Sequence, residues 1–259
     1  MRELSEKVTV GMDLGSRSVK IASLCGGQLT LSQYDTINFY CDYSSRTDEG
    51  LLLNRAMLGI GEAAVLMACG YGRQSVAVVG GGSVTEIEAH AAGVCFQIGE
   101  SDFLLLDIGG QDIKVIKVRN GRVADFYTND KCAASGGRYL ENMAQVLGLT
   151  LSQLAQYWQD PVPLSSTCAV FGESELIGKI AEGCPLSALA AGVNLSVVRR
   201  VQPFLARFLP AEKIYMSGGV ALNKSVVYLL SQALNQEVTV LPKPVYNGAI
   251  GCAAKAADK

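Results

Sequence analysis

The stretch Asp-Leu-Gly-Ser-Arg-Ser-Val-Lys-Ile at Asp13–Ile21 aligns without gaps with Asp-Ile-Gly-Gly-Gln-Asp-Ile-Lys-Val at Asp107–Val115. In each copy an aspartate ends an apolar strand, glycine makes a turn, and a second apolar strand follows. The strands predicted from this pattern are Val8–Met12, Val19–Leu24, Phe103–Leu106 and Ile113–Val118. Solenoid repeats have shorter periods, so two hairpins this far apart indicate a duplicated α/β lobe.

The glycine turn of each hairpin suits the binding of phosphate groups. Glycine permits a tight turn and lets a ligand approach the backbone, and the N–H groups of such a turn form a concave anion site. Lys20 offers a point positive charge to the phosphates. The predicted nucleotide contacts from the two turns are Gly15, Ser16, Arg17, Lys20, Gly109 and Gly110.

The strand-end aspartates need another role, because a carboxylate and a phosphate are both anions. Asp13 and Asp107 are expected to hold Mg2+ indirectly, through its water ligands, or to orient an attacking water. Gln111 is a further candidate for placing that water. Asp107, Gln111 and Asp13 are therefore the candidate catalytic residues. The alternative is that the segments are two unrelated hairpins with glycine turns.

A third segment, Ile214–Asn223, predicts a strand, a Gly218-Gly219 turn and a helix from about Val220 to Leu234. Such a glycine pair lets an adenosine lie close to the backbone, so Gly218, Gly219 and Asn223 join the predicted contacts. Two Asp-Gly hairpins followed by this turn resemble the acetate kinase, sugar kinase, heat-shock chaperone and actin superfamily. The resemblance implies an α/β fold of two duplicated lobes with ATP in the cleft between them. The chain has no Walker phosphate-loop sequence.

The other elements alternate between strands and helices, as in an α/β protein. The first lobe is expected to span residues 1–101, completed by a last helix over 247–259, and the second lobe residues 102–246. The remaining predicted helices are Leu51–Ala68, one capped by Thr85 and running through Ala92, one from near Cys132 to Leu147, one from Thr150 to about Gln159, Glu173–Gly183 and Pro185–Leu209. The remaining predicted strands are Leu29–Asn38, Ser75–Val79 and Val238–Leu241.

Composition narrows the class of protein. The chain has 259 residues, of which 49% are hydrophobic and 18% charged, and its formal net charge is -2. Nothing in the charge pattern favours nucleic acid or a membrane surface. We expect a cytoplasmic protein, because no signal-peptide core or transmembrane run is present. Its eight cysteines include no C-x-x-C pair, so most are expected to be reduced core residues.

Cys132 and Cys168 differ from the other cysteines because a polar run gives way to a predicted helix at each. The N–H groups and partial positive charge of a helix start favour a thiolate. A cubane iron–sulfur cluster needs four thiolates, which a two-fold dimer would supply from these two positions. The alternative is that both are buried cysteines at helix starts.

Four stretches together resemble the activator component of 2-hydroxyacyl-CoA dehydratases, a family that includes subunits of benzoyl-CoA reductase and the reductases of double-cubane cluster proteins. They are Asp107–Asp112, Asn129–Leu140, Ser165–Glu175 and Gly218–Asn223. The resemblance implies a homodimer with one 4Fe–4S cluster held by Cys132 and Cys168 of both chains. It also implies ATP-driven transfer of one low-potential electron, taken from ferredoxin or flavodoxin, to a partner iron–sulfur enzyme.

The chain departs from that family's pattern at two places. Ser135-Gly136-Gly137 stands where Gly-Thr-Gly is expected, and Phe171-Gly172 stands where Phe-Ala is expected. Neither change removes a cluster ligand, but Gly172 is expected to loosen its helix.

Two other functions fit the same fold. A small-molecule kinase would need a catalytic aspartate such as Asp42 or Asp48, and would hold no cluster. A nucleotide-binding assembly or chaperone module would make the cysteines incidental. His90, the sole histidine, is expected to be a helix residue with a local hydrogen bond. The sequence does not identify the enzyme that receives the electron.

Overall fold

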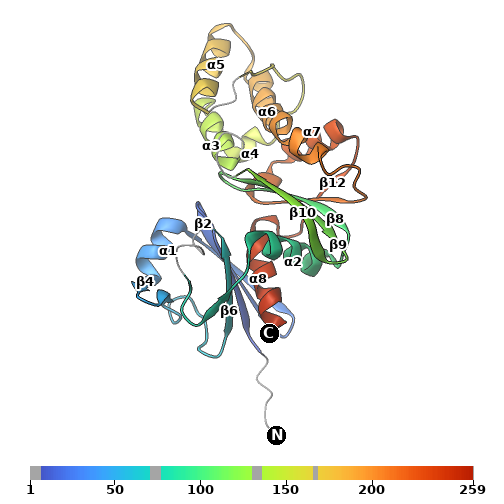
Figure 1. Ribbon diagram of the computed structural model, residues 1–259. Helices are drawn as coiled ribbons and strands as arrows, with labels where there is room; N and C mark the ends of the chain where they lie inside the picture. Colours follow the sequence, from blue (N-terminus) through green and yellow to red (C-terminus); the bar gives the residue numbers. More distant parts are fainter. Residues whose placement is uncertain (1–6, 71–76, 130–135, 166–168, 259) are drawn as a thin grey trace. The chain divides into compact units, whose positions relative to one another are not determined.

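The chain forms two compact α/β units. The computed structural model describes residues 7–70, 77–129, 136–165 and 169–258 (Figure 1). The first unit comprises residues 1–101, 120–123 and 246–259, and the second comprises 102–119 and 124–245. The chain therefore returns to its first unit at the end, and each unit is described separately below.

The described sheet of the first unit has the strand order β3-β2-β1-β6-β7. Strand β1 pairs antiparallel with β2 and parallel with β6, while β2–β3 is antiparallel and β6–β7 parallel. The bounds are β1 (Thr9–Leu14), β2 (Ser18–Cys25), β3 (Gln28–Asp35), β6 (Val65–Gly70) and β7 (Gly81–Ser83). The other elements are α1 (Thr36–Asp42), β4 (Ser44–Thr47), β5 (Gly50–Leu53), α2 (Glu86–Ile98) and α8 (Asn247–Ala257).

The described sheet of the second unit has the corresponding order β10-β9-β8-β11-β12. Its strands are β8 (Phe103–Ile108), β9 (Ile113–Arg119), β10 (Arg122–Asn129), β11 (Ile214–Ser217) and β12 (Val238–Val240). The helices are α3 (Gly137–Val146), α4 (Leu151–Leu154), α5 (Ala169–Ala181), α6 (Leu186–Ala206) and α7 (Lys224–Leu234), with short turns η3 (Gly219–Leu222) and η4 (Pro244–Tyr246).

The two sheets repeat one plan. In each, a first strand pairs antiparallel with the next strand in sequence and parallel with a later one, as β1 does with β2 and β6, and β8 with β9 and β11. The aligned Asp-Gly segments join β1 to β2 and β8 to β9. The predicted α/β fold with duplicated lobes is therefore confirmed at the level of strand order.

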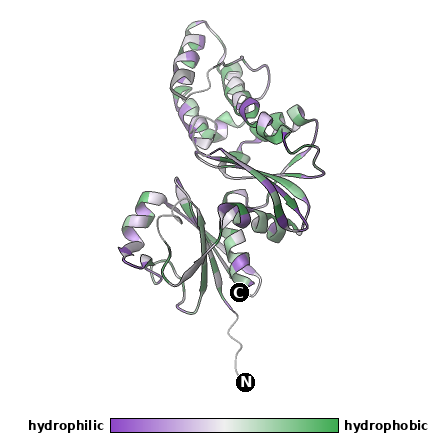
Figure 2. Ribbon diagram, viewed as in Figure 1, coloured by the Kyte–Doolittle hydropathy of each residue, from purple (hydrophilic) through white to green (hydrophobic). Residues whose placement is uncertain are grey.

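Each sheet is covered by apolar side chains. In the first unit, Val10, Met12 and Leu14 face a core that includes Phe39 of α1, and α8 packs on the opposite face. In the second unit, alternate residues of β8 and β9 pack against α3, α6 and α7. Hydrophobic residues, green in Figure 2, accordingly concentrate in the strands and in helices such as α8. No helix in the described parts of the chain is long and apolar enough to cross a bilayer.

The predicted helix over Leu51–Ala68 is wrong. The segment contains β5, a turn and the start of β6, whose residues Leu66–Gly70 are buried. Gly59 adopts a left-handed φ of 67°, which breaks a helix. Strand β6 then pairs along its length with β1. A strand that is buried on both faces has a continuous apolar run, and such a run resembles a buried helix in sequence.

Other predicted bounds need smaller corrections. The strand over Leu29–Asn38 ends at Asp35, because this carboxylate accepts hydrogen bonds from Ile37 and Asn38 N–H and caps α1. Thr85 caps α2 in a complete capping box, and that helix continues to Ile98. The capping box at Thr150 also forms, but its helix is one short turn.

Three further predictions concern the helix after the Gly218-Gly219 turn, the helix after Cys132 and the strand over Ser75–Val79. The helix expected from Val220 is divided into η3 and α7. The helix expected from near Cys132 begins at Gly137, after an extended Gly136. Residues 130–135 lie outside the described parts, as do Ser75 and Val76 of the predicted strand Ser75–Val79, whose Val78 forms an isolated bridge with Leu51.

Candidate nucleotide site

The first Asp-Gly turn contains an ion pair that the strand register creates. Asp13 and Lys20 are direct partners across β1 and β2, and Lys20 Nζ lies 3.7 Å from Asp13 Oδ2. Both side chains are largely buried. Lys20 therefore already has an anionic partner, in addition to the phosphate contact predicted for it.

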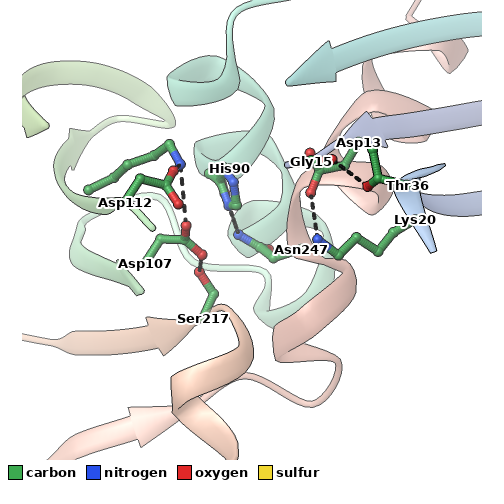
Figure 3. Close-up of polar contacts among 10 residues, drawn as sticks. Asp13, Gly15, Lys20, Thr36, His90, Asp107, Asp112, Ser217 and Asn247 are labelled. Atoms are coloured by element: carbon green, nitrogen blue, oxygen red, sulfur yellow. Dashed lines mark hydrogen bonds and ion pairs between the residues drawn. The ribbon is translucent and has the colours of Figure 1, made fainter. Parts of the chain in front are cut away.

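The rest of the first turn is tightly built. A Cβ on Gly15 would lie 2.8 Å from Ser18 O, so the turn has no space for one. Thr36 Oγ1 donates to Gly15 O at 2.8 Å, which holds the turn to the start of α1 (Figure 3). Ser16 and Arg17 are exposed at the tip, and Arg17 lies 3.8 Å from Asp35 in an open ion pair.

The second turn repeats the ion pair and extends it. Asp107 and Lys114 are register partners, and Lys114 Nζ lies 3.7 Å from Asp107 Oδ2. Lys114 also forms a close ion pair with Asp112, and Ser217 Oγ donates to Asp107 Oδ1 at 2.6 Å. This network is drawn in Figure 3. Asp107 and Lys114 are only 3% and 5% exposed, so their charges balance each other inside the protein.

The glycine pair lies beside the second turn because β8 and β11 are parallel neighbours, with Ser217 opposite Asp107. Gly218 has a left-handed φ of 86°, and a Cβ there would lie 2.2 Å from Ile108 O. Gly219 differs, since a Cβ there would meet no atom within 4 Å. Gly218 therefore packs directly against β8. The backbone at Gly219 is left uncovered, and a ligand can approach it closely.

Asn223, another predicted contact, has structural partners. Its Oδ1 accepts from Val226 N–H at 3.1 Å and caps α7, and its Nδ2 donates to Asn194 Oδ1 at 2.9 Å. Gln111 is half-buried next to the second turn. Contacts of either residue with a nucleotide remain predictions.

The second turn is joined by hydrogen bonds to the start of α3. Gly137 N–H donates to Gly109 O and Arg138 N–H donates to Gly110 O, both at 2.9 Å. Gly136 approaches the same carbonyls so closely that a Cβ would lie 2.9 Å from Gly109 O and 2.8 Å from Gly110 O. The first two amides of α3 therefore contact the second turn, and the role of this helix start beside a cluster remains a prediction.

Cys132 and Cys168, the predicted cluster ligands, lie outside the described residues. The helices that follow them are described: α5 begins at Ala169 and packs against α3. Among the described residues, no group of three His, Cys, Asp or Glu side chains is arranged to hold a metal ion. The cysteine at position 69 lies beside Asp13 in the sheet register. A hydrogen bond with Cys252, followed by burial, raises its thiol pKa well above the ordinary value.

Sequence reasoning missed several residues of this site. Ser217 and Lys114 belong to the segments Ile214–Asn223 and Asp107–Val115, but neither was predicted to contact Asp107. The gapless alignment of Lys114 with Lys20 could have predicted that the ion pair is repeated. Asp112 has serine at the aligned position of the first turn, so the repeat could not predict the second carboxylate. Asp42 and Asp48, proposed for a kinase, are exposed at the end of α1 and between β4 and β5. Nothing in their surroundings favours that function.

The two equivalent sheets, each with an Asp-Gly turn and a buried Asp–Lys pair, define a nucleotide-binding α/β protein of the actin and sugar-kinase type. A glucokinase of the ROK family from Streptomyces griseus, solved with glucose and AMPPNP, shares this fold with a TM-score of 0.60 at 14% identity over 97% of this chain and all of its own. This chain belongs to the BadF/BadG/BcrA/BcrD ATPase family, which it matches over residues 52–256. The family resemblance seen in the sequence is thereby confirmed.

Two relatives are similar over nearly their whole length. The (R)-2-hydroxyglutaryl-CoA dehydratase activating ATPase of Acidaminococcus fermentans is 36% identical over 255 residues, 97% of each chain. The solved activator of the 2-hydroxyisocaproyl-CoA dehydratase from Clostridium difficile, with bound ADPNP, has a TM-score of 0.81 at 30% identity, covering 97% of this chain and 94% of its own. Their names indicate different acyl-CoA dehydratases.

Proposed function

We propose that this protein is an ATP-driven activator that passes one electron to a partner iron–sulfur enzyme of the acyl-CoA dehydratase or reductase type. ATP binding would use the two Asp-Gly turns and the Gly218-Gly219 turn, with Mg2+ held through waters on Asp13 and Asp107. The names of the similar activators support the partner class. A double-cubane protein is a further candidate partner, and ferredoxin or flavodoxin is the proposed electron source.

The proposed redox group is a 4Fe–4S cluster shared by two copies of the chain, with Cys132 and Cys168 of each as ligands. When bound, such a cluster supplies one-electron reduction at low potential. The described surroundings fit the proposal, because Cys168 directly precedes α5 and Cys132 stands shortly before α3, and these two helices pack together. The start of α5 contributes partial positive charge next to Cys168.

One observation carries the coupling of ATP to this group. The carbonyls of Gly109 and Gly110 accept the first two N–H groups of α3, so the proposed phosphate turn and the helix after Cys132 are bonded to each other. A phosphate bound at that turn would move or hold α3 through these bonds. ATP, ADP and the empty site can shift the helix only by their different affinities for its positions.

Hydrolysis would complete the cycle. Water attacks the terminal phosphorus of ATP, the bond to the ADP oxygen breaks, and ADP and phosphate leave. Asp107 and Gln111 are the proposed residues for placing that water. The buried Lys114 is positioned to compensate the charge of Asp107 while the metal and the phosphates exchange.

The test of the redox group is anaerobic purification, with iron and sulfide reconstitution, followed by iron analysis and visible absorption. We expect a brown dimer with four irons, and colourless protein after Cys132→Ala or Cys168→Ala. Cys41→Ala is the matched control, because Cys41 is an exposed cysteine of the first unit, and this variant should keep the colour. A colourless, metal-free wild type would refute the electron-transfer function.

The test of coupling uses two substitutions at Gly137, the first residue of α3. Gly137→Pro suits the first turn of a helix but removes the N–H donated to Gly109. Gly137→Ala keeps that N–H, and its Cβ would have ordinary contacts of 3.4 Å or more. We expect the proline variant to lose most of the difference in electron-transfer rate between ATP and ADP, and the alanine variant to keep it. Equal rates with ATP and ADP in the wild type would refute the coupling.

A further inference from the structure

His90 is bonded to a residue from the other end of the chain, which corrects the expected local hydrogen bond. Asn247 Nδ2 donates to His90 O at 3.0 Å and lies 3.2 Å from His90 Nδ1 (Figure 3). Gln97 Nε2 donates to Asn247 Oδ1 at 2.9 Å. His90 is 7% exposed and Asn247 is fully buried. The three side chains belong to α2 and to the first residue of α8.

This arrangement fixes the tautomer of the imidazole ring. A backbone carbonyl only accepts hydrogen bonds, so the Asn247 amide must present its nitrogen to His90 O. The same nitrogen has a second hydrogen, which faces His90 Nδ1. In a neutral ring one nitrogen accepts and the other donates. Since Nδ1 accepts from Asn247, the proton of neutral His90 is on Nε2.

The Nε2 atom approaches the first Asp-Gly turn at Gly248. A Cβ on Gly248 would lie 3.3 Å from His90 Nε2 and 3.2 Å from Asp13 Oδ2. The donor atom of the imidazole and the acceptor oxygen of the carboxylate therefore face the same side of one glycine. Asp13 is also a buried polar side chain, 8% exposed, and Lys20 Nζ lies 3.7 Å from the same Oδ2 atom.

Close backbone contacts hold this group of residues in place. A Cβ on Gly251 would lie 1.7 Å from Ala89 O, and one on Gly93 would lie 2.2 Å from Asn247 O. A Cβ on Gly11 of β1 would lie 2.0 Å from Ala249 O. At these glycines the backbone of α8 lies directly against α2 and β1, so His90 and Asp13 are fixed relative to α8.

We infer that His90 is a positioning residue for Asp13. Held by Asn247 as the Nε2–H tautomer, it presents a hydrogen-bond donor to the carboxylate side of the first Asp-Gly turn and orients Asp13 for the magnesium-bound water of the nucleotide. This inference rests on the proposed role of Asp13 in nucleotide binding. It assigns a function to the sole histidine of the chain and to the first residue of the last helix.

The first test is a direct measurement of the tautomer. With one histidine per chain, a protein labelled with 15N-histidine gives one pair of imidazole nitrogen resonances, and long-range 1H–15N correlation tells which nitrogen carries the proton. We expect the Nε2–H form in nucleotide-free protein, with Nε2 shifting when Mg2+ and ADP are added. The Nδ1–H form, or an Nε2 resonance that ignores Mg2+ and ADP, would overturn the inference. This result does not depend on whether the protein transfers electrons.

The second test measures ATP hydrolysis against Mg2+ concentration. His90→Leu should raise the Mg2+ concentration for half-maximal rate roughly tenfold, the loss expected for one hydrogen bond to a charged group. His90→Gln can place an amide N–H near the Nε2 position and should stay within about threefold of wild type. Thr85→Ala is the control, because it weakens the cap of α2 without touching Asp13.

The outcomes of the second test separate three cases. Equal Mg2+ requirements for the leucine, glutamine and wild-type proteins would overturn the positioning role. Gly248→Ala, which places a methyl group against both Asp13 and His90, should raise the Mg2+ requirement and leave the tautomer unchanged. A wild type that hydrolyses no ATP would refute the proposed function, while the tautomer measurement would still decide whether Asn247 fixes His90.

Discussion

Gly172→Ala is expected to stabilise the second unit, and the structure gives the size of the effect. Gly172 is a buried residue of α5, where an added Cβ would lie 3.5 Å from Met143 Sδ and 3.6 Å from Tyr139 Cε2. These are ordinary contacts, so the methyl group fits. Alanine is favoured over glycine in a helix by about 1 kcal/mol, and burying the methyl group adds about 0.8 kcal/mol. The expected gain is therefore about 1.5–2 kcal/mol.

The matched control is Gly178→Ala on the same helix. Gly178 is exposed and a Cβ there would meet no atom within 4 Å, so this variant should gain only the helix-propensity part, about 1 kcal/mol. Urea unfolding can be followed by fluorescence of Trp158, the sole tryptophan, which belongs to the same unit. Equal gains for the two variants would refute the packing of α5 on α3, and a loss of stability in Gly172→Ala would show that the methyl group does not fit.

Three more predictions concern buried polar groups. Ser217→Ala removes the 2.6 Å hydrogen bond to Asp107 and should cost about 1.5–3 kcal/mol in urea unfolding; no change would mean that this bond contributes nothing. Lys114→Met deprives Asp107 of its buried ammonium partner and should lower the free energy of unfolding by about 3–5 kcal/mol. Lys20→Met should cost less, because the ion pair of Lys20 with Asp13 is less buried. A larger loss for Lys20→Met would contradict this account. A hydrogen bond with Cys252 and then burial raise the pKa of the Cys69 thiol, so above the unfolded thiol's ordinary pKa the unfolded chain loses a proton that the folded chain keeps. Stability should then fall by up to about 1.4 kcal/mol per pH unit, and Cys69→Ala should remove this part of the slope.

The fold could be predicted from the sequence because its decisive features are local and repeated. An apolar strand, an aspartate and a glycine turn occur twice, and each strand pair has the register that joins Asp13 to Lys20 and Asp107 to Lys114. Where the sequence failed, pairing with distant residues decided the structure. The sequence of β6 alone predicts a helix, whereas its parallel pairing with β1 makes it a strand.

The candidate site was predictable in its backbone and less so in its side chains. A short segment is enough to predict the glycines, because a tight turn requires them, and the strand-end aspartates, because they stand at the end of an apolar strand. The partners of Asp107 and His90 come from residues over 100 positions away, Ser217 and Asn247. No local pattern connects such residues, because only the packing of β8 on β11 and of α2 on α8 brings them together.

The return of the chain to its first unit has a consequence for biosynthesis. Helix α8 covers β1 and β6 and contacts α2, yet its residues are synthesised after the whole second unit. At about 5–20 residues per second, β1 waits on the order of ten seconds or more before its covering helix exists. During that time α8 does not yet cover Gly11 and Asp13 of β1, and the newly made first unit is accessible to chaperones and proteases. The second unit can close its own core first, so we expect the order of folding on the ribosome to be the reverse of the order of the units in the gene.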